Sequence, residues 1–134
     1  KPRTKEGFSA RVYLNANFTQ VGLAMSRSLG DRCVKHVGVI ADPAISTYTL
    51  SDNDVFFIVA SDGIWDHLSN EQAAAIVAEA IAKAAAAGTP QAPAACAAVL
   101  DHIEAGQASG ALDKNLTDDR GITVVIFSDF TVAI

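Results

Sequence analysis

Cysteine, basic residues and long apolar runs are all scarce in this sequence, and each shortage excludes a class of protein. Its 134 residues include only two cysteines, Cys33 and Cys96, which are too few for a disulfide framework and too far apart for a zinc knuckle. Ten lysines and arginines against fifteen aspartates and glutamates give a net charge of -5, the wrong sign for neutralising a nucleic-acid backbone. We therefore expect two reduced structural thiols and no nucleic-acid partner.

No apolar run approaches the roughly 20 residues that a bilayer span requires. The start of the chain, residues 1–5, is charged and lacks the apolar stretch of a signal peptide. We therefore expect no membrane partner and a cytoplasmic location.

The composition is that of a folded globular protein, because half of the residues are hydrophobic and 19% are charged. The length fits one domain. Residues 1–20 are mixed and polar, with 11–14 as the only short strand-like run. Since a domain usually opens with a tail or a capped element, we expect sequence to be missing on the N-terminal side.

Strand patterns become clear from residue 44 onwards. Residues 44–50 are β-prone, 51–54 have turn chemistry and 55–60 form a continuous apolar run. Together they predict a hairpin whose second strand is buried on both faces. Residues 121–127 have the same central-strand character.

Two helices are predicted between these last two strands. Ser69 followed by Gln72 is typical of a capping box, and apolar residues then recur on one helical face until Gly88. The second helix is predicted to begin near Thr89-Pro90 or at Pro93 and to stop at Gly106. Hairpin strands with consecutive helices inserted before a final strand predict an α+β fold with a mainly antiparallel sheet.

The apolar run 55–60 leads directly into Ser61-Asp62-Gly63. A carboxylate that emerges from a rigid apolar strand is held in one position, which suits a hard cation such as Mg²⁺ or Mn²⁺ that takes oxygen ligands. Gly63 is expected to let the chain turn sharply there. The alternative is that Asp62 caps a short helical turn at 63–66, and the local pattern alone favours this capping role.

A second acidic group, Asp118-Asp119, immediately precedes the last predicted strand. Taken alone, such a pair is usually a polar turn. However, Asp62 follows one strand and the pair precedes the other, so antiparallel neighbours would bring these carboxylates to the same edge of a sheet. Because adjacent strands lie about 4.8 Å apart, the carboxylates could share one ion or its bound waters.

Other candidates are weaker. The three histidines lack the mutual spacing of a metal site, and a lone histidine is more often a surface or satisfied core residue. Ser26 and Ser28 have no Ser-His-Asp context, and residues 22–30 lack the Gly-x-x-x-x-Gly-Lys pattern of a phosphate loop.

Five stretches occur in the order known from one enzyme family and span nearly the whole chain. They are Lys1-Pro2, resembling the end of Asp-His-Lys-Pro; 22–31, resembling Leu-Ala-x-Ser-Arg-x-Leu-Gly-Asp; 39–43; 57–65, with its Ala-Ser-Asp-Gly-x-Trp; and 118–125. The chain thus resembles the metal-dependent protein phosphatases of the PPM or type 2C group.

The resemblance implies an antiparallel β-sandwich flanked by helices, with two Mg²⁺ or Mn²⁺ ions at one edge. It implies a serine/threonine phosphatase that hydrolyses phosphoserine and phosphothreonine in phosphoprotein substrates through a metal-activated water. Asp62 matches a metal-ligating Asp of the family, and Asp118 or Asp119 matches the Asp of its closing block. Extra residues separate the acidic pair from Ile122. Aligning the family's closing block from its N-terminal side favours Asp118 as the match, and aligning it from the strand favours Asp119. We rank Asp118 first.

The family's N-terminal half, which carries a Glu, an Asp-Gly-His and a phosphate-binding Arg, is not in this chain. Residues 1–134 are therefore expected to be an incomplete, C-terminal portion of one phosphatase domain, with the N-terminal half as partner. No catalytic residue beyond the metal ligands is predicted in the chain, and we expect it to be inactive alone. Two alternatives remain: a catalytically degenerate phosphatase-fold module with a regulatory or binding role, and an independent structural domain without metal.

Overall fold

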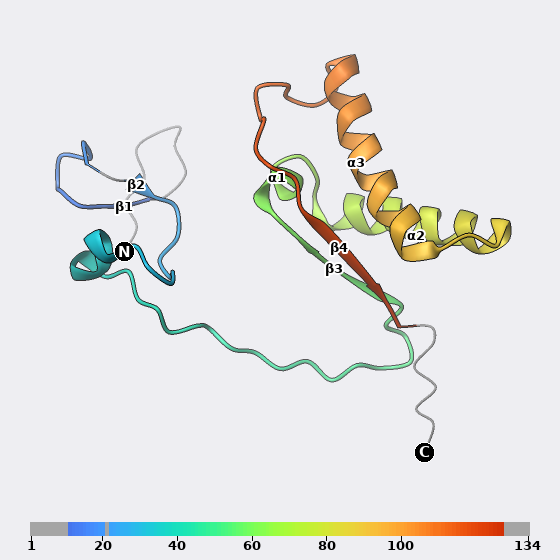
Figure 1. Cartoon of the computed structure of the whole chain (residues 1–134), viewed down its shortest axis with the longest axis horizontal. Coiled ribbons are helices and arrows are strands. Elements are labelled where there is room, and N and C mark those ends of the chain that lie inside the picture. Colours follow the sequence, from blue (N-terminus) through green and yellow to red (C-terminus); the bar gives the residue numbers. More distant parts are fainter. Residues whose placement is uncertain (1–10, 21, 128–134) are drawn as a thin grey trace. The chain divides into compact units, whose positions relative to one another are not determined.

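The computed structural model describes residues 11–20 and 22–127. The Lys1-Pro2 pair that resembles a family motif lies outside the described residues. The chain divides into two compact units, residues 1–49 and 50–134, and each is described by itself (Figure 1).

The first unit contains two short strands and a 3₁₀ helix. Strand β1 (Val12–Tyr13) pairs antiparallel with β2 (Gly22–Leu23). The helix η1 (Arg32–Val37) follows and buries Val34. The strand-like run predicted at 11–14 is thus confirmed.

The second unit contains one sheet and three helices. Strand β3 (Phe56–Ala60) is followed by α1 (Asp62–Trp65), α2 (Asn70–Ala87) and α3 (Gln91–Ser109), and strand β4 (Ile122–Ile126) closes the unit. Strand β4 pairs antiparallel with β3, so strands far apart in the sequence lie side by side. This confirms the neighbour relation on which the predicted site depends.

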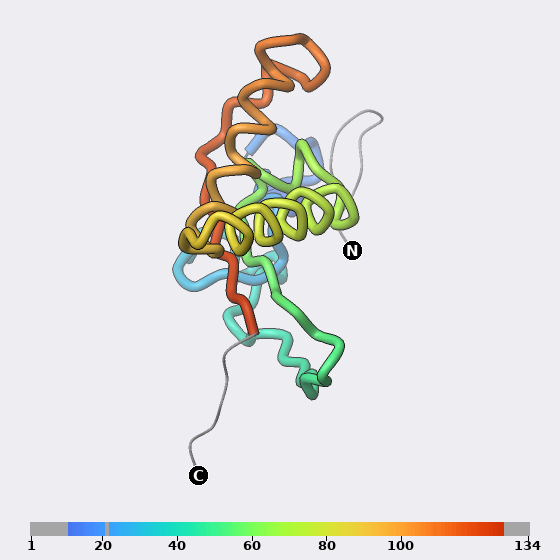
Figure 2. Tube along the Cα trace, turned by 90° about the vertical axis from the view of Figure 1, so that its right-hand side faces the viewer, coloured from blue at the N-terminus to red at the C-terminus, as the bar shows by residue number. Residues whose placement is uncertain are grey.

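Helices α2 and α3 pack together and cover one face of the β3–β4 sheet, as the side view in Figure 2 shows. Every second residue of β3 points to this face, beginning with Phe56. Alanines such as Ala73 and Ala95 are fully buried in the core, and their small side chains allow close packing. The core therefore lies behind β3, the strand that leads to Asp62.

The start and end of α2 follow the prediction. The Ser69 hydroxyl accepts a hydrogen bond from the Gln72 amide (3.3 Å), and the Ser69 amide donates to the Gln72 side chain (2.8 Å). These two bonds form the capping box. Gly88 ends the helix with a φ of 65°, a left-handed conformation that glycine adopts without strain.

The predicted end of α3 at Gly106 is wrong, because the helix continues to Ser109 and Gly110 takes the C-cap position. Gly106 serves close packing instead. A β-carbon added to Gly106 would lie 2.7 Å from Cγ of Leu112. The chain leaving α3 therefore folds back tightly against the helix.

The predicted hairpin is also wrong. Residues 44–50 form no strand and are exposed, and the partner of β3 is β4. The expectation that the strand at 55–60 is buried on both faces fails within this chain, because Phe57 and Val59 are 44% and 58% exposed. An apolar run alone does not reveal whether the covering layer lies in the same chain.

Both cysteines are free. Cys96 is half-buried on α3, whereas Cys33 is exposed and is not a core residue. In the part of the chain that the structure describes, no helix has the length and apolar character of a membrane span.

Candidate metal centre

Asp62 lies where β3 passes into α1. The N-cap of this helix is Ser61, and Asp62 is the first residue inside it. The capping interpretation of Asp62 is therefore wrong. Its side chain is exposed, and no hydrogen bond to it is found among residues 11–20 and 22–127. The carboxylate is thus free to bind another group.

Ser61 fastens this junction to the start of β4. Its amide donates to the Gly121 carbonyl (2.9 Å), and its hydroxyl accepts from the Gly121 amide (3.0 Å). The same hydroxyl donates to the Asp119 carbonyl (3.0 Å). The Ser61 side chain makes no capping bond to α1. Ser61 therefore links the strand that leads to Asp62 with the acidic pair.

Gly63 allows the closest approach in this region. A β-carbon added there would overlap the Asp119 carbonyl and would lie 3.1 Å from the Asp118 carbonyl oxygen. Gly63 has no positive φ, so the expected sharp turn is not its role. Its missing side chain leaves room for the Asp118-Asp119 backbone against α1.

The carboxylates of the acidic pair are exposed. One oxygen of Asp118 accepts the amide hydrogen of Asp119 (2.8 Å), which fixes the Asp118 side chain over its neighbour. A carboxylate has about four acceptor positions, so this bond leaves the others available.

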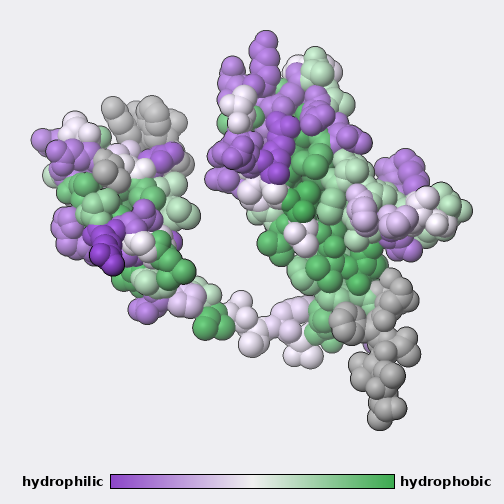
Figure 3. Space-filling model, viewed as in Figure 1, coloured by the Kyte–Doolittle hydropathy of each residue, from purple (hydrophilic) through white to green (hydrophobic). Residues whose placement is uncertain are grey.

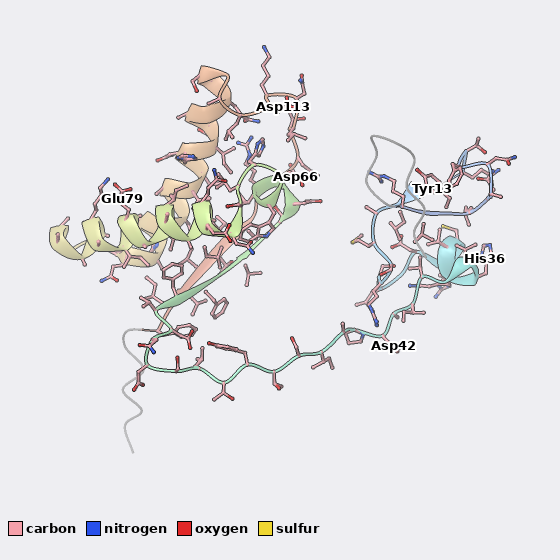
Figure 4. The ribbon with its side chains drawn as sticks, turned by 180° about the vertical axis from the view of Figure 1, so that it is seen from behind. Tyr13, His36, Asp42, Asp66, Glu79 and Asp113 are labelled. Carbon is pink, nitrogen blue, oxygen red and sulfur yellow. The ribbon has the colours of Figure 1, made fainter. Side chains whose placement is uncertain are left out.

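The sequence interpretation overlooked Asp66. It follows Asp62 by one helical turn, and its amide donates to the Asp62 carbonyl (2.8 Å). Residues at this spacing lie on the same side of a helix, so the spacing was a usable signal. Asp66 is exposed and lies beside α1 in Figure 4.

Among the described residues, no group of three or more His, Cys, Asp or Glu side chains is placed to hold a metal ion. His67 contacts a backbone carbonyl, that of Leu116 (3.2 Å). The described carboxylates can therefore provide only part of a ligand set.

Comparisons with known proteins show the family of this chain. The family model of Protein phosphatase 2C matches residues 4–114. "Probable protein phosphatase 2C 52" of Arabidopsis thaliana is 52% identical over 68 residues, which are 51% of this chain and 14% of that protein. "Probable protein phosphatase 2C 61" of the same plant is 50% identical over 77 residues, 58% of this chain and 23% of that protein.

A solved structure has the same fold. The crystal structure of serine-threonine phosphatase 2C from Toxoplasma gondii matches with a TM-score of 0.59 and 23% identity, covering 82% of this chain and 31% of that one. The chain thus spans under a third of the length of each of these relatives.

The chain belongs to the protein phosphatase 2C family. The predicted family and the predicted type 2C fold, α+β with antiparallel sheets and incomplete in this chain, are both confirmed. The matched residues include Asp62 and end before Asp118. The assignment of the acidic pair as candidate ligands therefore rests on local geometry and not on the family match.

Proposed function

We propose that this chain is the C-terminal portion of a Mg²⁺- or Mn²⁺-dependent protein serine/threonine phosphatase, and that Asp62 and one acid of the pair Asp118-Asp119 are metal ligands. The observation that carries the proposal is the contact at Gly63. It seats the backbone of the acidic pair against the helical turn that begins with Asp62. The backbones of Asp62 and of the acidic pair therefore lie at the same end of the β3–β4 sheet.

The donor set suits hard divalent cations, because the three candidate residues offer only carboxylate oxygens. Asp62 is exposed and unused by the helix cap. Asp118 keeps free acceptor positions beside its bond to the Asp119 amide. We keep Asp118 as the first choice of ligand and Asp119 as the second.

When bound, two such ions supply an activated water for attack on phosphorus and positive charge for the phosphoryl oxygens. The task of this chain is to hold the carboxylates in place. The rigid strand β3 fixes Asp62, and the Ser61 hydrogen bonds fix the backbone of Asp119. We propose that the remaining ligands and the phosphate-binding group come from the N-terminal half of the same domain.

The outer face of the β3–β4 sheet supports this division of the domain. Val55, Phe57 and Val59 of this face are 53%, 44% and 58% exposed, and Figure 3 shows apolar atoms gathered over the two strands. The Phe57 ring lies 5.6 Å from that of Phe127. An apolar patch of this kind marks an interaction site. We propose that the N-terminal half of the domain covers it.

The proposed substrates are phosphoserine and phosphothreonine in phosphoproteins. We place the enzyme in the cytoplasm, where two free cysteines stay reduced.

The test is hydrolysis of a phosphothreonine peptide by the full-length protein with Mn²⁺, beside an Asp62→Asn variant. We expect hydrolysis that depends on Mn²⁺ and is lost in the variant. If the wild-type protein is folded and binds Mn²⁺ but hydrolyses no phosphopeptide, the proposal fails. A regulatory module with a degenerate phosphatase fold would then be the better account.

A further inference from the structure

The segment 113–120, between α3 and β4, carries the acidic pair and is held at two places. One is the contact with Ser61 and Gly63 described above. The other is the backbone carbonyl of Leu116, which lies 2.9 Å from Nε2 of Gln107 and 3.2 Å from Nε2 of His67. A segment without helix or strand thus has fixed points on both sides of Thr117.

Gln107, on the last turn of α3, binds this segment at three positions. Its amide nitrogen donates to the carbonyls of Asp113 (3.1 Å) and Leu116 (2.9 Å). Its amide oxygen accepts from Nη2 of Arg120 (2.5 Å). One half-buried side chain therefore contacts both ends of the segment. The two ends flank the acidic pair.

His67 contacts the same segment through the Leu116 carbonyl. A carbonyl oxygen can only accept and has two lone pairs, so the Leu116 carbonyl accepts from Gln107 and, in the tautomer with the proton on Nε2, from His67 as well. His67 follows α1, the helix that begins with Asp62. The Leu116 carbonyl thus links the segment 113–120 to α3, through Gln107, and to His67, which follows α1.

Arg120 makes the Gln107 contact costly to lose. Its Nε atom is buried and has no hydrogen-bond partner in the part of the chain that the structure describes. Buried polar groups without partners destabilise the folded state. The bond from Arg120 to Gln107 therefore offsets part of the burial of this guanidinium. Figure 4 shows Asp113 and Asp66 at the same end of the unit.

We propose that Gln107, assisted by His67, is a positioning residue that holds the acidic pair beside Asp62 for metal binding. This inference rests on the proposed function, because it concerns the same metal site. Neither residue is a ligand, and both act through the backbone of the segment 113–120. Outer contacts of this kind govern how well ligands are oriented toward a metal.

The test is Mn²⁺ binding by the full-length protein, measured by calorimetry, with thermal unfolding of each metal-free protein. We expect Gln107→Ala to weaken Mn²⁺ binding about tenfold or more, the range typical of lost outer contacts. Gln107→Glu keeps an acceptor for Arg120 but cannot donate to the two carbonyls, so the same loss is expected. Glu104→Ala, an exposed position on the same helix, is the control and should bind as the wild type does.

His67 offers a second readout. His67→Gln keeps a donor for the Leu116 carbonyl and should retain Mn²⁺ affinity, whereas His67→Ala should lose several-fold. If Gln107→Ala does not fold, Gln107→Met fills the same volume without hydrogen bonds and takes its place. A folded Gln107 variant with wild-type Mn²⁺ affinity overturns the positioning role and leaves the proposed function standing. Absence of Mn²⁺ binding by the wild type overturns both.

Discussion

The carbonyl group of Asp119 occupies the space that a side chain on Gly63 would need. The two residues are far apart in the sequence, yet their backbones are in contact at the end of the β3–β4 sheet. Gly63 follows Asp62 directly, so the contact sets how near the acidic pair lies to the Asp62 carboxylate.

Gly63→Ala should therefore damage the site more than the fold. The added methyl group must push the Asp118-Asp119 backbone away, and overpacking of this kind costs about 1–3 kcal/mol. We expect Mn²⁺ affinity and phosphatase activity of the full-length protein to fall together, as measured by calorimetry and phosphopeptide hydrolysis.

Gly121→Ala is the matched control for this change. It lies at the same junction, but among the described residues a β-carbon there would meet only the Ser61 hydroxyl, at 3.9 Å. We expect near wild-type Mn²⁺ affinity. Equal effects of the two alanines would mean that the Gly63 contact has no special part in the site.

From the sequence, Asp62 and the acidic pair share a sheet edge only if the two apolar strands are antiparallel neighbours, and the structure confirms that pairing. The sequence was not sufficient to predict how the two groups are joined. The Ser61 hydroxyl makes no capping bond to α1 and binds Gly121 and Asp119 instead. Such a contact depends on tertiary approach, which no local pattern encodes.

The choice between the two acids is testable by Asp118→Asn and Asp119→Asn. Asparagine keeps an oxygen that can accept the Asp119 amide hydrogen at position 118, so the local turn should survive. We expect Asp118→Asn to weaken Mn²⁺ binding more than Asp119→Asn in a calorimetric titration. The reverse order would assign the ligand to Asp119, and wild-type binding by both variants would remove the acidic pair from the site.

A charge placed on the outer face of the β3–β4 sheet should destabilise the full-length protein. Val59 is 58% exposed in this chain, but we propose that the N-terminal half of the domain covers it. Val59→Asp would then bury an unpaired charge and lower the free energy of unfolding of the full-length protein by about 2 kcal/mol or more. Urea unfolding measures this, with Ala97→Asp at an exposed position of α3 as the control.

If Val59→Asp and Ala97→Asp lower the free energy of unfolding of the full-length protein equally, the outer face is not covered. The proposed division of the domain is then wrong.

Local sequence patterns also predict only part of the fold. The two long helices, the capping box of α2 and the last strand follow from periodicity and cap residues, which are local properties. Residues 44–50 have β-prone composition but form no strand in this chain, because β-propensity reflects packing against neighbours. Gly106 resembles a helix end but instead makes room for Leu112.

The most direct test of the account is a calorimetric Mn²⁺ titration of the full-length protein and its Asp62→Asn variant, with unfolding curves to show that both are folded. The account predicts that the wild type binds Mn²⁺ and that Asp62→Asn, which loses one charged oxygen ligand, binds at least about tenfold more weakly. Equal Mn²⁺ affinity of the two folded proteins would contradict it.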